Sequence, residues 1–427
     1  MATDVDVQYF SHLNGLTLGN NWGDLIRLLD KALVTGIDFT QITAASIDEQ
    51  GDIHITLYSN HNAMLFQVVE LSGFTPTSLN QKYRIKGVPN STQLILKSAL
   101  DIAERSITAI GEGKLASLGY DIIFRDANDV KRVYRAKNPT AQHPFIRVDE
   151  SLANPEGTAI YNISYAKFAM VGLLESMEHI DDFLNPDVLQ LPMYTANLGL
   201  NWSISGSGTS VARGVSRWYY ASRGLGVGGN DTASPTSGAR NFTLVGDSAA
   251  FYLMNPHDLT QDHKKIYGCG LFDSCQDDSI IPPWFLMTSM CVSRSASTSQ
   301  QIYNLDGGVP LISSKERSCF FVPAYNPANK LVANTKAYPI TPDYRSGNSD
   351  LQLSSNWFSN ISVPFYDEDK NLRGTLMHLL FNGGVGGFYA LNTTTPRLAG
   401  ESMYIQDSCY HPSNYKCGVS FYLGELT

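Results

Sequence analysis

The sequence predicts a mainly β protein, made of antiparallel β-sandwich or barrel modules and carrying one N-terminal amphipathic α-helix. Charged residues make up only 17% of the chain, against about 25% in typical soluble proteins. Glycine (35), tyrosine (22) and phenylalanine (19) are abundant, which favours strands and turns. Only one stretch has helical periodicity, whereas short alternating apolar runs recur along the chain. The 427 residues are enough for several domains.

The helix is predicted near the N-terminus, where apolar side chains recur at intervals of three and four residues. Asn20 or Asn21 would cap it and Gly36 would end it. The stripe would be buried either on its own domain or on a neighbouring subunit, so we take it as a candidate packing face. It consists of Trp22, Leu25, Ile26, Leu29 and Leu33.

Strands are predicted from alternation of apolar and polar residues, and turns separate them. Ile53, Ile55 and Leu57 begin a small β module, and Asn128-Asp129 joins two alternating runs in a hairpin. Further candidates are 83–85, 94–96, 120–124, 130–135, 145–148, 160–174, 242–245, 250–254, 320–322, 362–365 and 419–423. The glycine- and serine-rich stretch 206–238 predicts a long loop.

Composition shifts and turn clusters divide the chain into four predicted parts. Residues 1–50 form the helix and a docking segment, and 51–102 form the small β module. Residues 103–185 form a β domain that contains the hairpin, and Asn185-Pro186 breaks the pattern after it. Residues 186–427 form a larger β domain with the glycine- and serine-rich insertion.

Net charge and hydropathy exclude several kinds of partner. The net charge of −9 argues against binding to nucleic acid or to an anionic membrane. The most apolar stretch, residues 280–292, is too short to span a membrane and contains two prolines. The N-terminus has no secretory signal, so we expect synthesis in the cytoplasm and reduced cysteines.

Motif searches predict no catalytic, cofactor-binding or metal-binding residues. The closest histidines, His257 and His263, lack a metal-ligand spacing. Residues 367–371 begin like a calcium loop, but Leu372 and His378 stand where glycine and glutamate are needed, so a hairpin turn is favoured. The acids Asp149/Glu150 and Asp181/Asp182 would suit a glycosidase only at a spacing that sequence cannot supply.

Arginines and aromatic residues gather in one stretch of the second half. Arg213, Arg217 and Arg223 flank the aromatic run Trp218, Tyr219 and Tyr220. Such a set is typical of protein interfaces and of sugar-binding clefts, although buried aromatics with cross-strand charge pairs would leave the same pattern. We take Arg217, Trp218, Tyr219, Tyr220 and Arg223 as a candidate contact surface. For the basic hairpin, with Lys131, Arg132, Arg135 and Lys137, charge pairing is favoured.

Five stretches, taken in order, resemble virion structural proteins of tailed bacteriophages. They are residues 9–36, 68–96, 145–182, 241–253 and 372–379. The second is similar to a recurrent "isG.tp..lNg.yrv" β module and the last to an "iRG.lpgl" stretch. The chain departs from these patterns at Asn80-Gln81, where Asn-Gly is usual, and at Met377-His378, where Pro-Gly is usual, so turns are expected to differ there.

The resemblance implies a non-enzymatic structural subunit of the phage particle, in the tail or baseplate region. Alternatives are a collar, neck or head-decoration protein. A carbohydrate-binding receptor protein, with Trp202, Trp218 and Tyr219 as sugar platforms, is a rival, and a depolymerase is a third class. The implied partners are copies of the chain, other virion proteins and a host surface glycan; no nucleic acid, membrane insertion or cofactor is expected. The implied location is the virion, after synthesis in the host cytoplasm.

Overall fold

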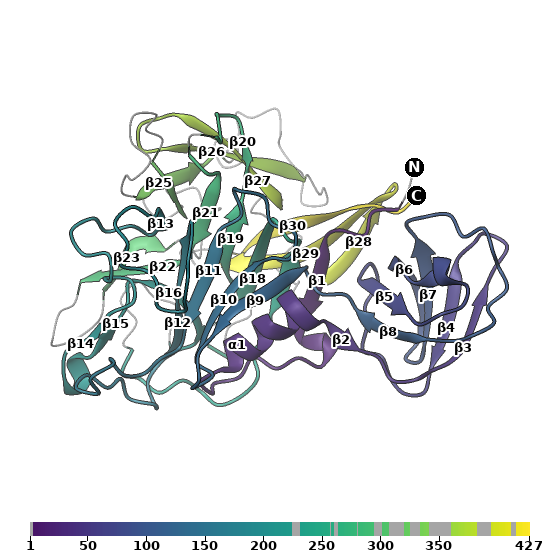
Figure 1. Ribbon diagram of the computed structural model, residues 1–427, viewed down its shortest axis with the longest axis horizontal. Helices are drawn as coiled ribbons and strands as arrows, with labels where there is room; N and C mark the ends of the chain where they lie inside the picture. The colour runs from purple at the N-terminus through teal and green to yellow at the C-terminus, as the bar shows by residue number, and fades with distance from the viewer. Residues whose placement is uncertain are drawn as a thin grey trace.

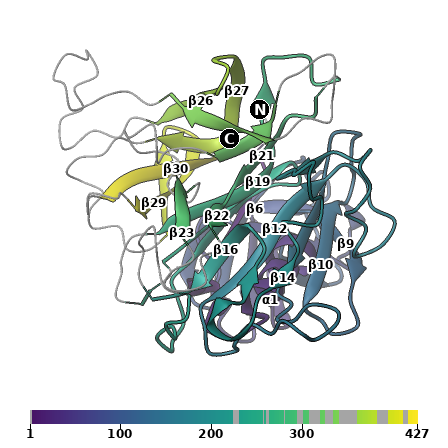
Figure 2. The ribbon, with the colours of Figure 1, turned by 90° about the vertical axis from the view of Figure 1, so that its left-hand side faces the viewer.

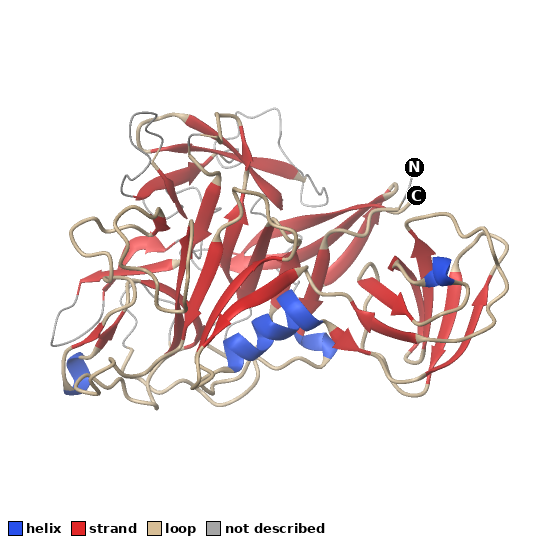
Figure 3. Ribbon diagram, in the orientation of Figure 1, coloured by secondary structure: helices blue, strands red, loops and turns tan. Residues whose placement is uncertain are grey.

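The computed structural model of the chain confirms a mainly β protein with antiparallel sheets and one short α-helix near the N-terminus (Figure 3). It describes residues 3–223, 231–256, 258–259, 264–279, 281–293, 301–306, 320–324, 334–340, 360–381, 394–410 and 416–427. Three sheets carry the architecture, and a two-stranded ribbon of β14 (Ile204–Ser205) and β15 (Ala212–Arg213) adds to them.

The smallest of the three sheets has seven strands and stands apart at one end of the molecule (Figure 1). Its order is β2 (Ile37–Asp38), β8 (Glu112–Leu115), β5 (Val68–Ser72), β6 (Lys82–Asn90), β7 (Gln93–Ser98), β4 (Ile53–Leu57) and β3 (Ile42–Ile47). The alternation seen in the sequence is real here, because Ile53, Ile55 and Leu57 are buried while the residues between them are half-buried. The predicted small β module lies in this sheet, which also includes β2, β3 and β8.

A second sheet has eight strands. Its order is β23 (Gln301–Asp306), β22 (Ser289–Ser293), β16 (Ser216–Ala221), β12 (Lys167–Leu174), β11 (Phe145–Asp149), β10 (Lys131–Ala136) and β9 (Tyr120–Arg125), and β13 (Gln190–Leu191) pairs with β12. The hairpin β9–β10 is confirmed, and its Asp129 has a φ of 61°. The strand expected over 160–174 begins only at Lys167, because residues 162–165 form a turn.

The stretch 206–238 is not one long loop, because it contains β16, which lies between β12 and β22 in the eight-stranded sheet. Every residue of β16 is buried, so the strand carries no alternating signal in the sequence. The glycine run 224–229 within that stretch lies outside the described residues.

The largest sheet has thirteen strands. Its order is β1 (Gln8–Ser11), β17 (Thr243–Gly246), β18 (Ala250–Asn255), β19 (Lys265–Leu271), β21 (Trp284–Met287), β24 (Phe320–Pro323), β25 (Asn334–Pro339), β26 (Ile361–Asp367), β27 (Leu372–Phe381), β30 (Lys416–Glu425), β29 (Ser402–Tyr410) and β28 (Thr395–Ala399), and β20 (Asp273–Ser274) pairs with β27. The turn between β26 and β27 is the predicted polar hairpin, closed by the Asp367 N–H on the Asn371 carbonyl.

The eight-stranded sheet packs against β18 and β19 of the largest sheet, as the view in Figure 2 allows the reader to follow. Trp218 stacks on Tyr267 at 5.9 Å between ring centroids and meets the edge of Phe251 at 5.9 Å. The opposite face of β18 carries Tyr252, which contacts Phe285 and Phe421 in a second core. The central strands are therefore buried on both faces.

The predicted helix is present as α1 (Asp24–Leu29), which continues through a π-helical segment (Asp30–Thr35) and ends at Gly36. Gly36 has a φ of 73° and its backbone N–H bonds the Lys31 carbonyl, as expected of a closing glycine. The predicted caps Asn20 and Asn21 are wrong, because Gly23 holds the N-cap position without a side-chain cap. The missing cap comes from another strand, as described below.

Buried polar side chains tie the small sheet to the rest of the chain. Arg84 on β6 is fully buried and donates to the carbonyls of Asp4, Val7, Phe66 and Leu423 at 2.7–3.0 Å. Gln8 donates to the carbonyls of Val68 and Ala116, both at 2.8 Å. Both termini lie beside this junction (Figure 1). These bonds join the two chain ends and the small sheet into one polar seam.

One departure from the phage-like pattern, His378 in place of the usual glycine, lies at a backbone conformation that favours glycine. His378 has a φ of 60°, in the left-handed region where glycine is favoured, and the resembling proteins have glycine there. His378 is held in place by the Asp247 carboxylate, 3.1 Å from its Nε2. At the other departure, Gln81 does not adopt a positive φ, so a side chain is tolerated.

Candidate functional site

A polar pocket of about 520 Å³ opens where the chain enters α1, and we take it as the candidate functional site. Three loops build its wall: the residues before α1, the turn before β12, and the segment that follows Asp231. The lining residues are Asn20, Asn21, Trp22, Ile163, Ser164, Lys167, Ser234, Pro235 and Ser237. The lining therefore offers an aromatic ring, two amides, three hydroxyls and one amine.

Trp22 is fixed in the pocket wall by contacts on three sides. Its Nε1 donates to the Ile163 carbonyl at 3.0 Å. The guanidinium of Arg213 lies 4.8 Å from the ring centroid and the amine of Lys167 lies 5.2 Å from it. Cations over an aromatic face are attracted by the ring quadrupole. The ring is therefore a held aromatic surface, half-buried in the chain.

Lys167 is the one charged residue in the lining of the pocket. Its Nζ donates to the carbonyls of Ile163 and Tyr165, both at 2.6 Å. Burial, and then the positive charge of Arg240, lower the pKa of Lys167 to about 8. The amine is therefore a hydrogen-bond donor that loses its charge at mildly alkaline pH.

A buried group of arginines and aromatics supports the pocket from behind. Arg213 lies over the Phe168 ring at 4.5 Å and the Tyr161 ring at 5.3 Å, and donates to the Ser151 carbonyl at 2.7 Å. Arg217 pairs with Asp231 at 2.8 Å. Burial raises the pKa of the Asp231 carboxyl, although Arg217 opposes that shift. This support fixes the turn before β12 and the segment after Asp231.

The structure places the sequence-predicted contact surface mostly inside the chain. Arg217, Trp218, Tyr219 and Tyr220 are at most 2% exposed, so the surface prediction is corrected at these four positions. The Trp218 Nε1 donates to the Met287 carbonyl at 3.1 Å, deep between the two sheets. Arg223 is exposed, and its role as a contact residue stays a prediction. Of the two interpretations that the sequence leaves open, a contact surface or buried aromatic residues, the structure shows buried aromatic residues at these positions.

The predicted packing face of the helix is also buried within the chain. Its aliphatic members are at most 1% exposed and belong to the core shared with the eight-stranded sheet; they are Leu25, Ile26, Leu29 and Leu33. Trp22 alone leaves this face and reaches the pocket. Of the two alternatives for the stripe, the described residues show packing on its own chain.

The acids considered for glycosidase chemistry are engaged in structural contacts. Glu150 accepts from the backbone N–H groups of Gly23 (2.6 Å) and Ile26 (3.2 Å) and from the Tyr220 hydroxyl (2.8 Å), so it caps α1. Burial raises the pKa of Glu150, and these hydrogen bonds oppose that shift. Asp149 pairs with Arg147 at 2.9 Å, and Asp181 pairs with Lys131 and Arg147.

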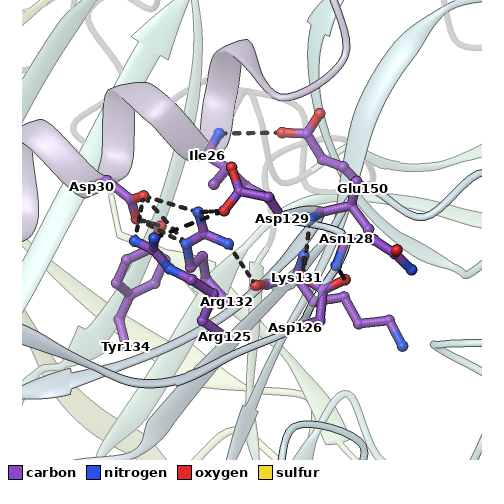
Figure 4. Close-up of polar contacts among 11 residues, drawn as sticks. Ile26, Asp30, Arg125, Asp126, Asn128, Asp129, Lys131, Arg132, Tyr134 and Glu150 are labelled. Atoms are coloured by element: carbon purple, nitrogen blue, oxygen red, sulfur yellow. Dashed lines mark hydrogen bonds and ion pairs between the residues drawn. The ribbon is translucent and has the colours of Figure 1, made fainter.

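The basic hairpin β9–β10 docks on the same helix, which Figure 4 shows. Arg132 is 2% exposed in its side chain and pairs with Asp30 at 3.2 Å and with Asp129. The Tyr134 hydroxyl donates to Asp30 at 2.8 Å. These opposite charges hold the helix against the sheet. The cross-strand pairing on a solvated face that the sequence favours is not what the structure shows, because Arg132 is buried and its partner Asp30 lies in the helical segment after α1.

No motif in the sequence marks Lys167, Ser164 or Ser234 as site residues. One signal was present: Lys167 stands alone at the start of an apolar run that becomes a buried strand. A lone lysine at such an end is expected to reach toward solvent or a site. The platform residues proposed from sequence, Trp202 and Trp218, are 6% and 0% exposed, so they cannot present a ring to a sugar.

Metal ligands and membrane-spanning helices are the last features that bear on the site. In the described ranges, no group of three or more His, Cys, Asp or Glu side chains is placed to hold a metal ion. No helix of the described chain is long and apolar enough to cross a membrane. Cys269 and Cys275 are free thiols, and His257 and His263 lie outside the described residues.

Comparisons with known proteins add a distant likeness. No protein family and no curated protein match the sequence. Among solved structures, the phage phi92 endosialidase is similar over 92% of this chain at 9% identity, with a TM-score of 0.14. This chain spans about half (51%) of that protein's length. The expectation of a non-enzymatic chain is contradicted by this similarity to an enzyme and is not retained, and a likeness this distant assigns no activity to the chain.

Proposed function

We propose that the chain is a structural subunit of a tailed-bacteriophage particle, located in the tail or baseplate region. The observation that carries the proposal is where the five phage-like stretches lie in the fold. They are far apart in the sequence, yet each contains all or part of at least one strand of the three sheets, and the first also contains α1. They hold much of the framework and also most of the pocket lining, since residues 20–22 and 163–167 fall within the first and third stretches. Only the loop at 234–237 lies outside them.

The phage-like stretches also contact one another directly. Tyr9 of the first pairs with Val245 of the fourth in the β1–β17 ladder. Glu150 of the third caps the helix of the first through Gly23. The Gln67 side chain, next to the second stretch, donates to the Tyr9 carbonyl at 2.8 Å. A resemblance that follows one connected framework supports a shared fold more strongly than scattered matches do.

Assembly is the mechanism that this proposal requires. We infer that copies of the chain associate with one another and with other virion proteins, through apolar residues that the single chain leaves exposed. Examples on the described surface are Tyr58 (77% exposed), Ile163 (68%) and Leu184 (64%). Contact between copies would bury these side chains, as subunit interfaces do.

Particle fractionation tests this proposal. Mass spectrometry of purified virions, and of tails separated from heads, is expected to detect the chain in the tail fraction. Immunogold labelling should then place it at the tail end. Labelling at the neck or head would favour the collar, neck or head-decoration alternative, and absence from all particle fractions would contradict a structural role.

We also propose a second function, recognition of a host surface glycan, which the Trp22 pocket favours. Aromatic rings that pack on sugar faces, together with amides and hydroxyls, are the groups that carbohydrate sites use. Glycan-array binding by the purified chain should be lost in Trp22→Ala and kept in Tyr58→Ala, which removes an exposed aromatic of the small sheet. Equal binding by both variants would contradict this site.

A further inference from the structure

The largest sheet brings β19 and β29, which are far apart in its strand order, together at one buried pair of side chains. Lys264 immediately precedes β19 and forms a parallel bridge with Cys409 of β29. Its Nζ lies 2.5 Å from Oδ2 of Asp407, also on β29. The two side chains are 1% and 0% exposed. Residues 143 positions apart therefore meet in a site without solvent.

The two oxygens of the Asp407 carboxyl accept hydrogen bonds from different kinds of donor. Oδ1 accepts the backbone N–H of Ser408 at 2.7 Å. Oδ2 accepts the hydroxyl of Thr243 at 2.6 Å as well as the lysine amine. The Thr243 oxygen lies 2.6 Å from the Thr394 hydroxyl and 3.4 Å from Nζ. One oxygen is thus held by a backbone donor and the other by a relay of hydroxyl and amine protons.

A buried ion pair is an expensive way to join two strands, because removing both charges from water costs several kcal/mol for each ion. Condensation of the pair to an amide removes both charges at once. Fixed contact between the reacting groups replaces a slow encounter. We propose that Lys264 and Asp407 form an intramolecular isopeptide bond.

The atoms of the step balance without any added reagent. The Nζ of Lys264 attacks Cγ of Asp407, and the N–C bond forms. Negative charge develops on Oδ1, where the Ser408 N–H stabilises it as an oxyanion-hole donor does. The Cγ–Oδ2 bond then breaks, and Oδ2 leaves as water with two protons from the original ammonium group, passed directly or through Thr243. The amide nitrogen keeps the third proton.

The bond would join two parts of the sheet that are far apart in its strand order. On one side it anchors the segment β17–β18–β19, near one end of that order, and on the other the β30–β29–β28 end. A covalent link between these ends closes a loop of well over a hundred residues and so restricts the unfolded chain strongly, as a disulfide between distant residues does. It needs no oxidising compartment, unlike a disulfide.

Intact mass spectrometry of the purified full chain, denatured and reduced, tests the proposal. The wild-type mass is expected to be lower than the sequence mass by about 18 Da, the mass of one water. Proteolysis should release a branched peptide that joins the segments containing Lys264 and Asp407. A wild-type mass equal to the sequence mass would overturn the proposal, and this measurement does not depend on the folding of any variant.

Two substitutions assign the loss to this pair. Lys264→Ala and Asp407→Ala are each expected to show the full mass of their own sequence, even when they are recovered from inclusion bodies. Lys336→Ala is the matched control, because Lys336 pairs with Glu368 at 3.3 Å on the surface, and it should keep the loss. A water loss that persists in Lys264→Ala would overturn the assignment.

Discussion

The small seven-stranded sheet and the pair of larger sheets bury their strands in different ways. In β4 buried residues alternate with half-buried ones, so one face of the small sheet is packed and the other meets solvent. In β12, β16, β18 and β19 every residue is buried, because these strands have packed cores or loops on both faces. Stability in the larger sheets therefore rests on two packed faces at once, and in the small sheet on one face and on the seam around Arg84.

The largest expected effect comes from Trp218, which lies between two sheets. Trp218→Ala removes a ring that is fully buried against Phe251 and Tyr267 and should lower the free energy of unfolding by about 4 kcal/mol, within the range for buried aromatic truncation. Ile55→Ala, in the small sheet, should cost about 2–3 kcal/mol. Chemical denaturation followed by tryptophan-independent circular dichroism measures both. A larger cost for Ile55→Ala would break the comparison.

Arg84 tests whether the two regions unfold together. Arg84→Met keeps the buried stem but leaves four carbonyls of three segments without their donor, and should cost about 3 kcal/mol. Because the lost bonds link the small sheet to both termini, differential scanning calorimetry should resolve a separate, earlier transition for the small sheet. Lys86→Met is the control. Lys86 lies on the same strand as Arg84 and its half-exposed side chain pairs with Asp52, so this variant should keep a single transition. A single transition in Arg84→Met would show that apolar packing alone joins the regions.

Glu150 connects the eight-stranded sheet to the helix. Glu150→Gln retains the size of the side chain but presents an amide donor toward the N–H groups of Gly23 and Ile26. An uncapped, buried helix start should cost about 2 kcal/mol. Hydrogen exchange should show faster exchange of the amides in residues 23–26 while the β10–β11 amides stay protected. Uniformly faster exchange across the sheet would contradict a local capping role. Glu156→Gln, on an exposed turn, is the control.

The same contrast explains which parts of the fold could be predicted from sequence. β4 and the β9–β10 hairpin follow alternation and turn residues, so local pattern was enough. β18 is also buried on both faces, yet its apolar run was found from sequence. β16 and β19 were not found, because Ser216 and Arg217 open β16 and two glycines interrupt β19, and neither strand has a polar side to alternate. The helix was found from its stripe, but its cap was not, because Glu150 lies 127 positions from Gly23.

The candidate site was predicted only in part, for a related physical reason. The sequence marked the arginines and aromatics around Trp218, which are the buried support, and missed Lys167 and the serines that line the pocket. A short-range sequence pattern identifies where arginines and aromatic residues cluster along the chain. Whether their side chains are exposed depends on which sheet packs over them. Only the fold shows that Trp22 leaves the helix stripe at the pocket while Trp218 is enclosed.

The smallest expected effect concerns Lys167, where the buried framework meets the pocket. Its pKa in the folded chain is lowered to about 8 from 10.5. The unfolded chain therefore binds more protons between these values, and the contribution of Lys167 to stability rises as pH increases from about 8 to about 10.5. Because the pocket is open to solvent, screening limits the change to about 1 kcal/mol.

The difference in unfolding free energy between wild type and Lys167→Met isolates this change from other titrating groups. Measured by urea denaturation at pH 8 and at pH 10, the difference should move in favour of the wild type at the higher pH. Lys114→Met, at a partly exposed lysine of the small sheet paired with Glu70, provides the matched control and should show no such movement. A stability difference that stays constant between the two pH values would contradict this prediction. It would mean that Lys167 is as well solvated in the pocket as in the unfolded chain. The pocket would then resemble the solvent-facing side of the small sheet more than the enclosed framework.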